Sequence, residues 1–211
     1  MSRQNELLEN LFSELGSFKK MPPEFFQHLQ DAMQEQKKYY PEAEVLFDQD
    51  DLVKNAYYVA RGTVYAYRIE NGEKRVLYIY KQHDIIAGNA FMHQKESLYY
   101  LKTCSDSFLY WITYDQMAEV YTKFPEAEEL AKLIVSNRED REVTWKTMLN
   151  QKATATVKDF YTLYPELLKR QKGLTDPDIA TFLHLAEGTL RGLRNKLLKG
   201  AILKLPAKKA P

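Results

Sequence analysis

The sequence predicts an α+β protein with an antiparallel β sandwich or barrel in its first half and a helical C-terminal part. From Tyr39 to Thr113, short runs rich in β-branched and aromatic residues alternate with turn residues, as in antiparallel sheets. A long helical pattern then covers Glu126–Leu149. Residues 151–211 carry 12 Lys+Arg against 5 Asp+Glu, whereas residues 1–150 carry 18 against 24. Positive charge is therefore concentrated at the C-terminal end, which favours a polyanionic partner there.

The composition is that of a folded protein in a reducing compartment. The 211 residues suffice for one large domain or two modest ones, and 45% apolar and 13% aromatic residues supply a packed core. Cys104 is the only cysteine, which excludes an internal disulfide framework. The sequence has no run of about 18 apolar residues and no apolar signal segment near its start. We therefore expect a cytoplasmic protein with no membrane partner.

Two short helices and then a series of strands are expected in the first half. Apolar residues at helical spacing predict one helix over Glu6–Leu15, and "PPEFF" begins a second that runs towards Gln36. Asn71-Gly72, between two alternating runs, fits the type I′ turn of a β hairpin. The tyrosines of these runs are expected in the core and flanks of the sheets. The expected strands are "YYVA", "TVYAYRI", "RVLYIY", "DIIAG", "LYYLKT" and "FLYWIT".

The long helix over Glu126–Leu149 follows a short helix that Pro125 closes. Its first half is strongly apolar, its middle, "SNREDRE", is charged, and apolar residues return near its end. So much apolar surface on a connecting helix needs a partner, which is the barrel, the same helix of a second subunit, or both. This pattern predicts a homodimer.

The segment "LTDPDIATFLHLAEGTLRGLRNKLLKG" predicts two short helices joined by a tight turn. Thr175 is a suitable N-cap, with Asp178 three residues later and Pro177 in the first turn. A small residue, Ala180, would let a second helix approach closely. The predicted buried stripes are Ile179, Phe182 and Leu183 on the first helix and Leu190, Leu193, Leu197 and Leu198 on the second.

The second of these helices carries a basic outer face. Arg191 flanks that face, while Arg194 lies nearer the apolar edge and is expected to pair within the protein. A tight turn followed by a basic amphipathic helix is the anatomy of a helix-turn-helix, with an ordinary helical hairpin as the alternative. The residues opposite the leucines are Gly188, Gly192, Asn195, Lys196 and Lys199.

Two segments carry a family resemblance. The stretch "VLFDQDDLVKNAYYVARGTVYAYRIENGEKRVLYIYKQHDIIAG" looks like a cyclic-nucleotide-binding β-roll, with Gly62 and Gly72 at its turns. The stretch "DIATFLHLAEGTLRGLRNKLL" looks like the helix-turn-helix of the Crp/Fnr family of bacterial transcription regulators. This resemblance implies an antiparallel β-roll of the double-stranded jelly-roll type, a long dimerisation helix and a C-terminal winged-helix-like domain. The implied domains are a sensor (1–125), a dimerisation helix (126–150) and a DNA-binding domain (151–211).

The chain departs from the family pattern at three places. His184 stands where the family has a glycine in a left-handed turn, which implies a strained or altered turn. Recognition-helix positions that are usually polar or arginine are here Glu187, Gly188 and Gly192, with Arg191 one place early. The wing is reduced to "GAILKLPAKKAP", at most a strand and a tail.

The resemblance implies a dimeric, non-enzymatic transcription regulator whose partners are double-stranded DNA and RNA polymerase. Arg191 and Asn195 are the best candidates for contacts with base edges. Because two glycines face outward, we expect sequence specificity to be weak or carried by DNA shape. The expected DNA-binding residues are Glu187, Gly188, Thr189, Arg191, Asn195, Lys196 and Lys199, and the lysines, joined by Lys204, Lys208 and Lys209, would mainly contact phosphate.

Two alternatives from other classes remain open. A ligand-sensing adaptor that binds another protein and has lost DNA binding would differ only in the function of Arg191, Asn195 and Lys199. A cupin-type metalloenzyme would need histidines and a carboxylate that converge on a metal. The four histidines are scattered in the sequence, and His93 and Glu96 form only a lone pair, so neither a metal nor another cofactor is expected.

The phosphate cassette implied by the resemblance is degenerate. In cyclic-nucleotide-binding members, a Gly-Glu pair contacts the ribose and an Arg-Ser pair clamps the cyclic phosphate. The aligned positions are Gly88-Asn89 and Ser97-Leu98, and loss of the arginine leaves a bound phosphate uncompensated. We therefore expect no specific cyclic AMP or cyclic GMP binding; the roll holds a different, unidentified effector or is closed by its tyrosines. The nearest cations in the sequence are Lys95 and Lys102.

Overall fold

The computed structural model describes residues 3–168 and 173–205, and its first half is built of two antiparallel four-stranded sheets. Their strand orders are β1-β8-β3-β6 and β2-β7-β4-β5, so strands far apart in the sequence are neighbours, as in a jelly roll. The predicted antiparallel roll is therefore confirmed. The strands are β1 (Lys37–Tyr40), β2 (Val45–Phe47), β3 (Asn55–Arg61), β4 (Val64–Glu70), β5 (Glu73–Tyr80), β6 (Ile85–Ile86), β7 (Tyr100–Thr103) and β8 (Ser107–Thr113).

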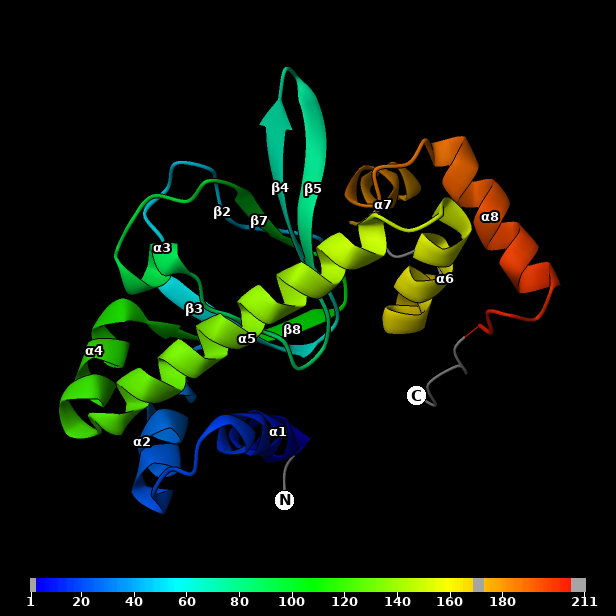
Figure 1. The fold of residues 1–211 in the computed structure, drawn as a ribbon. Helices are drawn as coiled ribbons and strands as arrows, with labels where there is room; N and C mark the ends of the chain where they lie inside the picture. Colours follow the sequence, from blue (N-terminus) through cyan, green and yellow to red (C-terminus); the bar gives the residue numbers. More distant parts are fainter. Residues whose placement is uncertain (1–2, 169–172, 206–211) are drawn as a thin grey trace.

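The helices flank the roll and continue beyond it (Figure 1). The helices α1, α2 and α4 lie at one end of the roll, α5 crosses it, and α6, α7 and α8 lie beside the β4–β5 hairpin. The long helix α5 has the predicted bounds. The helices are α1 (Arg3–Phe18), α2 (Pro23–Met33), α3 (Asn89–Met92), α4 (Tyr114–Lys123), α5 (Glu126–Leu149), α6 (Ala153–Leu163), the 3-10 helix η1 (Pro165–Leu168), α7 (Asp176–Phe182) and α8 (Glu187–Lys199).

Three boundaries of the N-terminal helices differ from those expected. The first helix is longer than the predicted Glu6–Leu15, and α2 ends at Met33, before the predicted Gln36. The carbonyl of Gln36 accepts a hydrogen bond from the backbone N–H of Trp111 in β8 (3.0 Å). This part of the chain is therefore already committed to the sheet, and the helix stops before it.

Glycines permit two of the turns in the roll. Asn71 and Gly72 both have positive φ angles, 53° and 83°, so they form the primed turn that the sequence predicted between β4 and β5. Gly62, between β3 and β4, has a φ of 92°, and a Cβ there would come within 2.4 Å of Ser107 Oγ. Only glycine fits this position, where the chain passes from one sheet to the other.

The first half of α5 packs mainly against its own chain. Ala127 and Leu130 are buried in a core shared with α1, α2, α4 and the roll, and Ile134 packs against that core. The predicted partner of this apolar surface is therefore, in large part, the chain's own roll and helices. Leu133 and Val143 remain on the outside, with 38% and 62% of their surface exposed.

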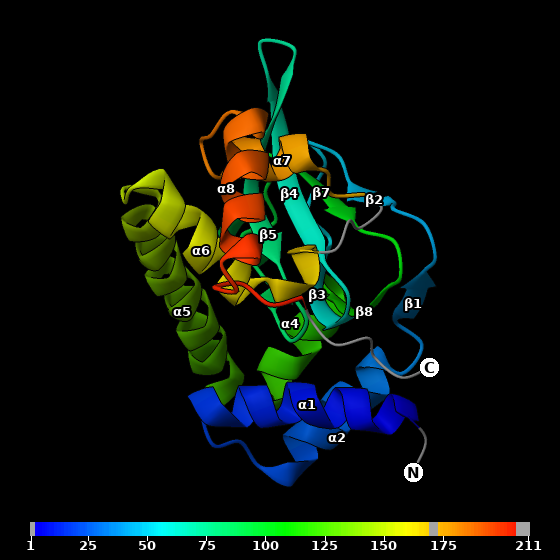
Figure 2. The ribbon, with the colours of Figure 1, turned by 90° about the vertical axis from the view of Figure 1, so that its right-hand side faces the viewer.

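The C-terminal helices share a second core with the outer face of the roll. Tyr65, Val76 and Ile79, from β4 and β5, are buried in the same cluster as Phe160 of α6 and Leu190 of α8. Figure 2 shows α7 and α8 lying directly beside these two strands. The helical part is therefore docked on the sheet.

Polar contacts fix this docking. Lys74 Nζ of β5 lies 2.7 Å from Asp178 Oδ1 of α7, and Asp178 is nearly buried. The backbone N–H of Val76 donates to Thr181 Oγ1 (3.2 Å), and Tyr164 Oη donates to the carbonyl of Ile79 (2.9 Å). Two hydrogen bonds and a partly buried ion pair thus join β5 to the helices that follow α5.

Candidate nucleic-acid interface and ligand site

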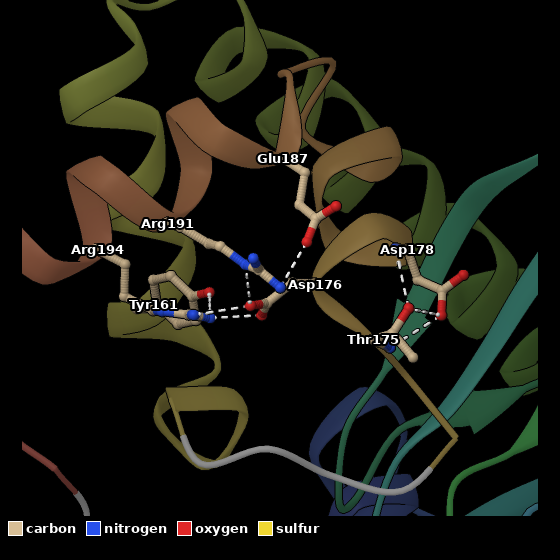
Figure 3. A network of polar contacts seen from close by, with 7 residues as sticks. All are labelled: Tyr161, Thr175, Asp176, Asp178, Glu187, Arg191 and Arg194. Atoms are coloured by element: carbon tan, nitrogen blue, oxygen red, sulfur yellow. Dashed lines mark hydrogen bonds and ion pairs between the residues drawn. The ribbon is translucent and has the colours of Figure 1, made fainter.

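The N-terminus of α7 is capped as its sequence predicts. Thr175 Oγ1 accepts a hydrogen bond from the backbone N–H of Asp178 (3.4 Å), and the Asp178 carboxylate accepts one from the backbone N–H of Thr175 (2.8 Å) (Figure 3). Pro177 lies in the first turn. Such a reciprocal cap stabilises a helix by about 1 kcal/mol and fixes where it begins.

The turn after α7 is left-handed, although His184 stands where the family has a glycine. His184 has a φ of 55°, a conformation that costs a non-glycine residue about 1–2 kcal/mol. The N–H of Leu185 donates to the carbonyl of Ala180 (2.9 Å), and that of His184 donates to Thr181 (3.2 Å). These two bonds form a Schellman motif, which normally carries glycine at this position. Of the two outcomes expected at His184, a strained or an altered turn, the structure has the first, because the turn keeps its left-handed form with a non-glycine residue in it.

The helix α8 buries one face and exposes the other, as predicted. Leu190 and Leu197 are buried, and Leu193 and Leu198 pack against the same core. A Cβ added at either outward glycine, Gly188 or Gly192, would meet nothing within 4 Å, so this face is open. Glu187 is half-buried at its start. The exposed residues are Gly188, Thr189, Arg191, Gly192, Asn195, Lys196 and Lys199.

Arg194 is held inside the protein by Asp176, the first residue of α7. Its two terminal nitrogens lie 2.6 and 2.8 Å from the two carboxylate oxygens, and Nη1 also donates to Tyr161 Oη (3.1 Å) (Figure 3). Only 14% of the Arg194 side chain and 9% of the Asp176 side chain are exposed. The prediction that Arg194 pairs within the protein is confirmed, and the pair ties α8 to α7 and α6.

Arg191, which the sequence offered as a base-contacting residue, also turns towards carboxylates. Its Nε lies 3.2 Å from Asp176 Oδ2 and its Nη2 lies 2.7 Å from Glu187 Oε1, although 51% of the side chain is exposed. The hydrogen bond from Arg194 lowers the pKa of Asp176, burial opposes this, and Arg191 lowers it further. The carboxylate is thus charged at neutral pH, and Arg191 must leave two acidic partners to reach a base.

The chain after α8 does not form a wing within the described residues. Residues 201–205 form turns and bends with no strand, and Leu203 is buried against the helical core. Lys204, the fifth residue after the end of α8, is exposed. Lys208 and Lys209, expected to add phosphate contacts, lie outside the described residues.

The four cassette positions supply no cation, and the structure uses them in different ways. Gly88 precedes α3, Asn89 is its first residue, and Ser97 is buried in the following loop. Ser97 is used internally, because its hydroxyl donates to the carbonyl of Tyr99 (2.6 Å) and its backbone N–H to that of Asp51 (2.8 Å). Leu98 is 78% exposed.

The space between the two sheets is filled by side chains. Tyr57, Val59 and Leu109 from one sheet and Tyr80 and Leu101 from the other are buried in one cluster. In β7, Leu101 faces this interior, and since side chains alternate along a strand, the next residue, Lys102, points to the opposite face. Lys102 therefore does not supply the missing cation.

An arginine that sequence reasoning missed does reach the cassette region. Arg138 of α5 approaches Gly88 so closely that a Cβ on Gly88 would lie 2.7 Å from Arg138 Nη1. The guanidinium also lies over the ring of Tyr78, 4.9 Å from its centre. Its signal in the sequence was the charged segment "SNREDRE", but helical periodicity alone could not say which element this segment faces.

Comparison with known proteins agrees with this architecture. Residues 37–124 match the family model described as the cyclic nucleotide-binding domain. No curated protein has a sequence that matches the chain significantly. The roll is therefore a cyclic-nucleotide-binding-type domain in its fold.

Several solved structures are similar over most of the chain. FixK2 of Bradyrhizobium japonicum has a TM-score of 0.65 at 13% identity, covering 82% of this chain and 88% of FixK2. The catabolite activator protein of Thermus thermophilus has a TM-score of 0.52 at 18% identity, covering 90% of both chains. The c-di-GMP-responsive global regulator CLP of Xanthomonas campestris has a TM-score of 0.58 at 16% identity, covering 89% of this chain and 97% of CLP. At these identities, the similarity establishes the fold.

Two further observations concern possible partners. In the described part of the chain, no helix is long and apolar enough to cross a bilayer. Among the same residues, no three His, Cys, Asp or Glu side chains are grouped so that they could hold a metal ion.

Proposed function

We propose that the protein is a dimeric, DNA-binding transcription regulator of the Crp/Fnr type, and not an enzyme. The observation that carries the proposal is the outer face of α8, where Asn195, Lys196 and Lys199 are exposed while Leu190 and Leu197 anchor the helix in a core. A helix held in this way can lie in a major groove. The lysines would neutralise phosphates, Asn195 would contact a base edge, and RNA polymerase would be a further partner.

The test is the salt dependence of binding to duplex DNA, followed by fluorescence anisotropy. Each phosphate contact contributes about 0.9 to the slope of log affinity against log salt concentration. The double variant Lys196→Ala/Lys199→Ala should therefore weaken binding to every sequence and reduce this slope by about 2. The matched control is Lys20→Ala/Lys54→Ala, which removes two exposed lysines from the N-terminal half. An unchanged slope in the α8 variant would contradict the proposal.

One set of observations favours the competing adaptor function. Arg191 is engaged by Asp176 and Glu187, and Gly188 and Gly192 present no side chains to a base. A protein that dimerises and binds another protein would have no need of a base-reading surface. The DNA-binding experiment above separates the two functions. If the protein is an adaptor, the parent and the double variant Lys196→Ala/Lys199→Ala should bind duplex DNA equally weakly.

We propose that two copies associate along α5. The exposed residues Leu133, Ser136, Asp140, Val143 and Thr147 follow one another at spacings of three and four, so they form one stripe along the helix. Leu133 and Val143 are the apolar members of this stripe. Light scattering at micromolar protein should report a dimer, and Val143→Glu should shift it to monomer. A monomeric parent protein would contradict the proposal.

The proposed function assigns a role to each of three parts of the chain. We propose a sensor domain over residues 1–125, a dimerisation helix over 126–150 and a DNA-binding domain over 151–211, acting in the cytoplasm. Because Ser97 is used internally and Leu98 points outward, the roll is proposed not to bind cyclic AMP or cyclic GMP specifically. Calorimetry that gives micromolar affinity for either nucleotide would contradict this.

A further inference from the structure

Asp176, the first residue of α7, holds two arginines of α8 with one carboxylate. Its Oδ1 lies 2.6 Å from Arg194 Nη1, and its Oδ2 lies 2.8 Å from Arg194 Nη2 and 3.2 Å from Arg191 Nε. Only 9% of the Asp176 side chain is exposed. A nearly buried residue outside α8 thus contacts the arginine that the sequence offers for reading bases.

A second carboxylate holds Arg191 from within α8. Glu187 lies one turn before Arg191, and its Oε1 is 2.7 Å from Arg191 Nη2. The Nε and Nη2 atoms form one edge of the planar guanidinium, and such an edge can make bidentate contacts. Both donors of this edge are engaged by carboxylates, and the side chain is directed from α8 towards the first turn of α7 (Figure 3).

The other residues on this face do not replace Arg191 as an arginine that reads bases. Gly188 and Gly192 carry no side chain, and Arg194 has only 14% of its side chain exposed. The lysines of α8 are exposed, but contacts with phosphate carry no sequence information. Recognition of guanine by an arginine of α8 therefore depends on Arg191.

The cluster allows Arg191 to leave without exposing the charge of Asp176. Arg194 makes two contacts with the Asp176 carboxylate and also donates to Tyr161 Oη (3.1 Å), so this pair is complete without Arg191. The contact of Arg191 with the carboxylate is the longest of the three, and 51% of the Arg191 side chain is exposed. Release of Arg191 therefore avoids the costly case of an unpaired buried charge.

We propose that Asp176 and Glu187 form a gate that holds Arg191 away from DNA bases, and that Asp176 is a positioning residue for sequence reading by α8. This inference rests on the proposed function. With the gate closed, α8 binds duplex DNA mainly through its lysines and discriminates weakly between sequences. With the gate open, Arg191 donates to O6 and N7 of a guanine in the major groove.

A bracing role for the same carboxylates gives the opposite expectation. If Asp176 and Glu187 orient Arg191 towards a base, removing either charge loosens the reader and lowers sequence discrimination. If they hold Arg191 back, removing either charge raises discrimination. The course of the Arg191 side chain towards α7 favours the second role, and the direction of the change decides between the two.

The test is a ratio of two affinities for duplex DNA, measured by fluorescence anisotropy with the full chain. The first duplex is the one that Glu187→Gln enriches from a randomised library, and the second carries A·T at its enriched G·C positions. We expect Glu187→Gln to raise this ratio at least about fivefold over the parent, which is the lower limit for a bidentate guanine contact. This variant leaves the pair between Asp176 and Arg194 intact. Asp176→Asn should act in the same direction at a temperature where it remains folded.

Two controls separate the gate from a general effect of charge. Removing a carboxylate near DNA strengthens binding to every sequence, so the ratio is measured instead of the affinity alone. Asp159→Asn removes one negative charge from α6 and should leave the ratio unchanged. Adding Arg191→Ala to Glu187→Gln should abolish the gain in the ratio, because the gate acts only through Arg191.

The outcomes distinguish failure of the gate from failure of the proposed function. An unchanged or lower ratio in both Glu187→Gln and Asp176→Asn would overturn the gate alone. A gain that persists when Arg191→Ala is added, or that Asp159→Asn reproduces, would also overturn it. If neither the parent nor the variants bind any duplex in a salt-dependent way, the proposed function fails and the gate fails with it.

Discussion

Neither the outer face of α8 nor the loop around α3 presents an unpaired arginine, although the family resemblance implies one in each region, and the reasons are opposite. At α8, two arginines are present, and Asp176 draws both inward, one of them into a nearly buried pair. At α3, the loop carries no arginine, and Arg138 arrives from α5 to lie against Gly88 and Tyr78. The difference teaches that the location of charge in this protein depends on which carboxylates and rings lie nearby, and not on the element that carries the charge.

The two regions also differ in what a partner would have to displace. A DNA base that recruits Arg191 must compete with Asp176 and Glu187, whereas an anion that binds Arg138 competes with one glutamate at 3.4 Å. Recruiting Arg191 to a base would therefore cost more than recruiting Arg138, whose carboxylate partner is Glu142 alone among the ion pairs of the described residues. This contrast leads to four predictions.

The largest effect is expected at Arg194. Arg194→Ala leaves the carboxylate of Asp176 nearly buried without its two-pronged partner, and breaking such a pair costs about 3–5 kcal/mol. Urea unfolding followed by tryptophan fluorescence should show this loss, since Trp145 packs in the same core. Arg194→Lys keeps the positive charge but cannot make the two-pronged contact, so its stability should lie between that of the parent and that of Arg194→Ala. A loss below about 1 kcal/mol would mean that the pair does not hold α8 to α7.

Replacing the carboxylate should have a smaller, pH-dependent effect. We expect Asp176→Asn to lower the free energy of unfolding by about 2 kcal/mol at neutral pH, because the hydrogen bonds lose their charge. The folded-state pKa of Asp176 is lowered, so its contribution is present above the unfolded value of about 3.9 and is lost as the pH falls through the folded value. The difference in unfolding free energy between parent and variant should therefore be largest at neutral pH and shrink as the pH falls below the unfolded pKa of about 3.9. A constant difference would exclude this linkage.

A still smaller effect is expected at Gly88. Its φ of −123° suits any residue, so Gly88→Ala need only displace the end of the Arg138 side chain. We expect the free energy of unfolding to change by no more than about 1 kcal/mol. Urea unfolding measures this change, and Gly16→Ala, where a Cβ meets nothing within 4 Å, is the comparison without a contact to Arg138. Equal changes in the two variants would mean that the contact between Gly88 and Arg138 does not affect stability.

The smallest effect is expected at Arg191. Half of its side chain is exposed, and exposed ion pairs contribute little, so Arg191→Ala should cost less than about 1 kcal/mol in urea unfolding. Set beside Arg194→Ala, this variant measures how burial separates two arginines that share one carboxylate. If Arg191→Ala and Arg194→Ala lower the free energy of unfolding equally, burial does not distinguish the two arginines.

The sequence by itself determined the features that depend on neighbouring residues. The Asn71-Gly72 turn, the cap made by Thr175 and Asp178, and the bounds of α5 were all predicted, because each rests on backbone geometry within a few positions. The buried leucines of α8 were predicted for the same reason, since helical periodicity sets which residues share a face.

Only the tertiary structure decided which partners the charged side chains contact. Periodicity indicated that Arg194 faces inward, but the position of Asp176 relative to α8 depends on the turn at His184 and on the packing of α6. The approach of Arg138 to Gly88 depends on how α5 crosses the roll. These contacts join elements whose relative orientation is set by the summed packing of two cores, and no short segment of sequence contains that information.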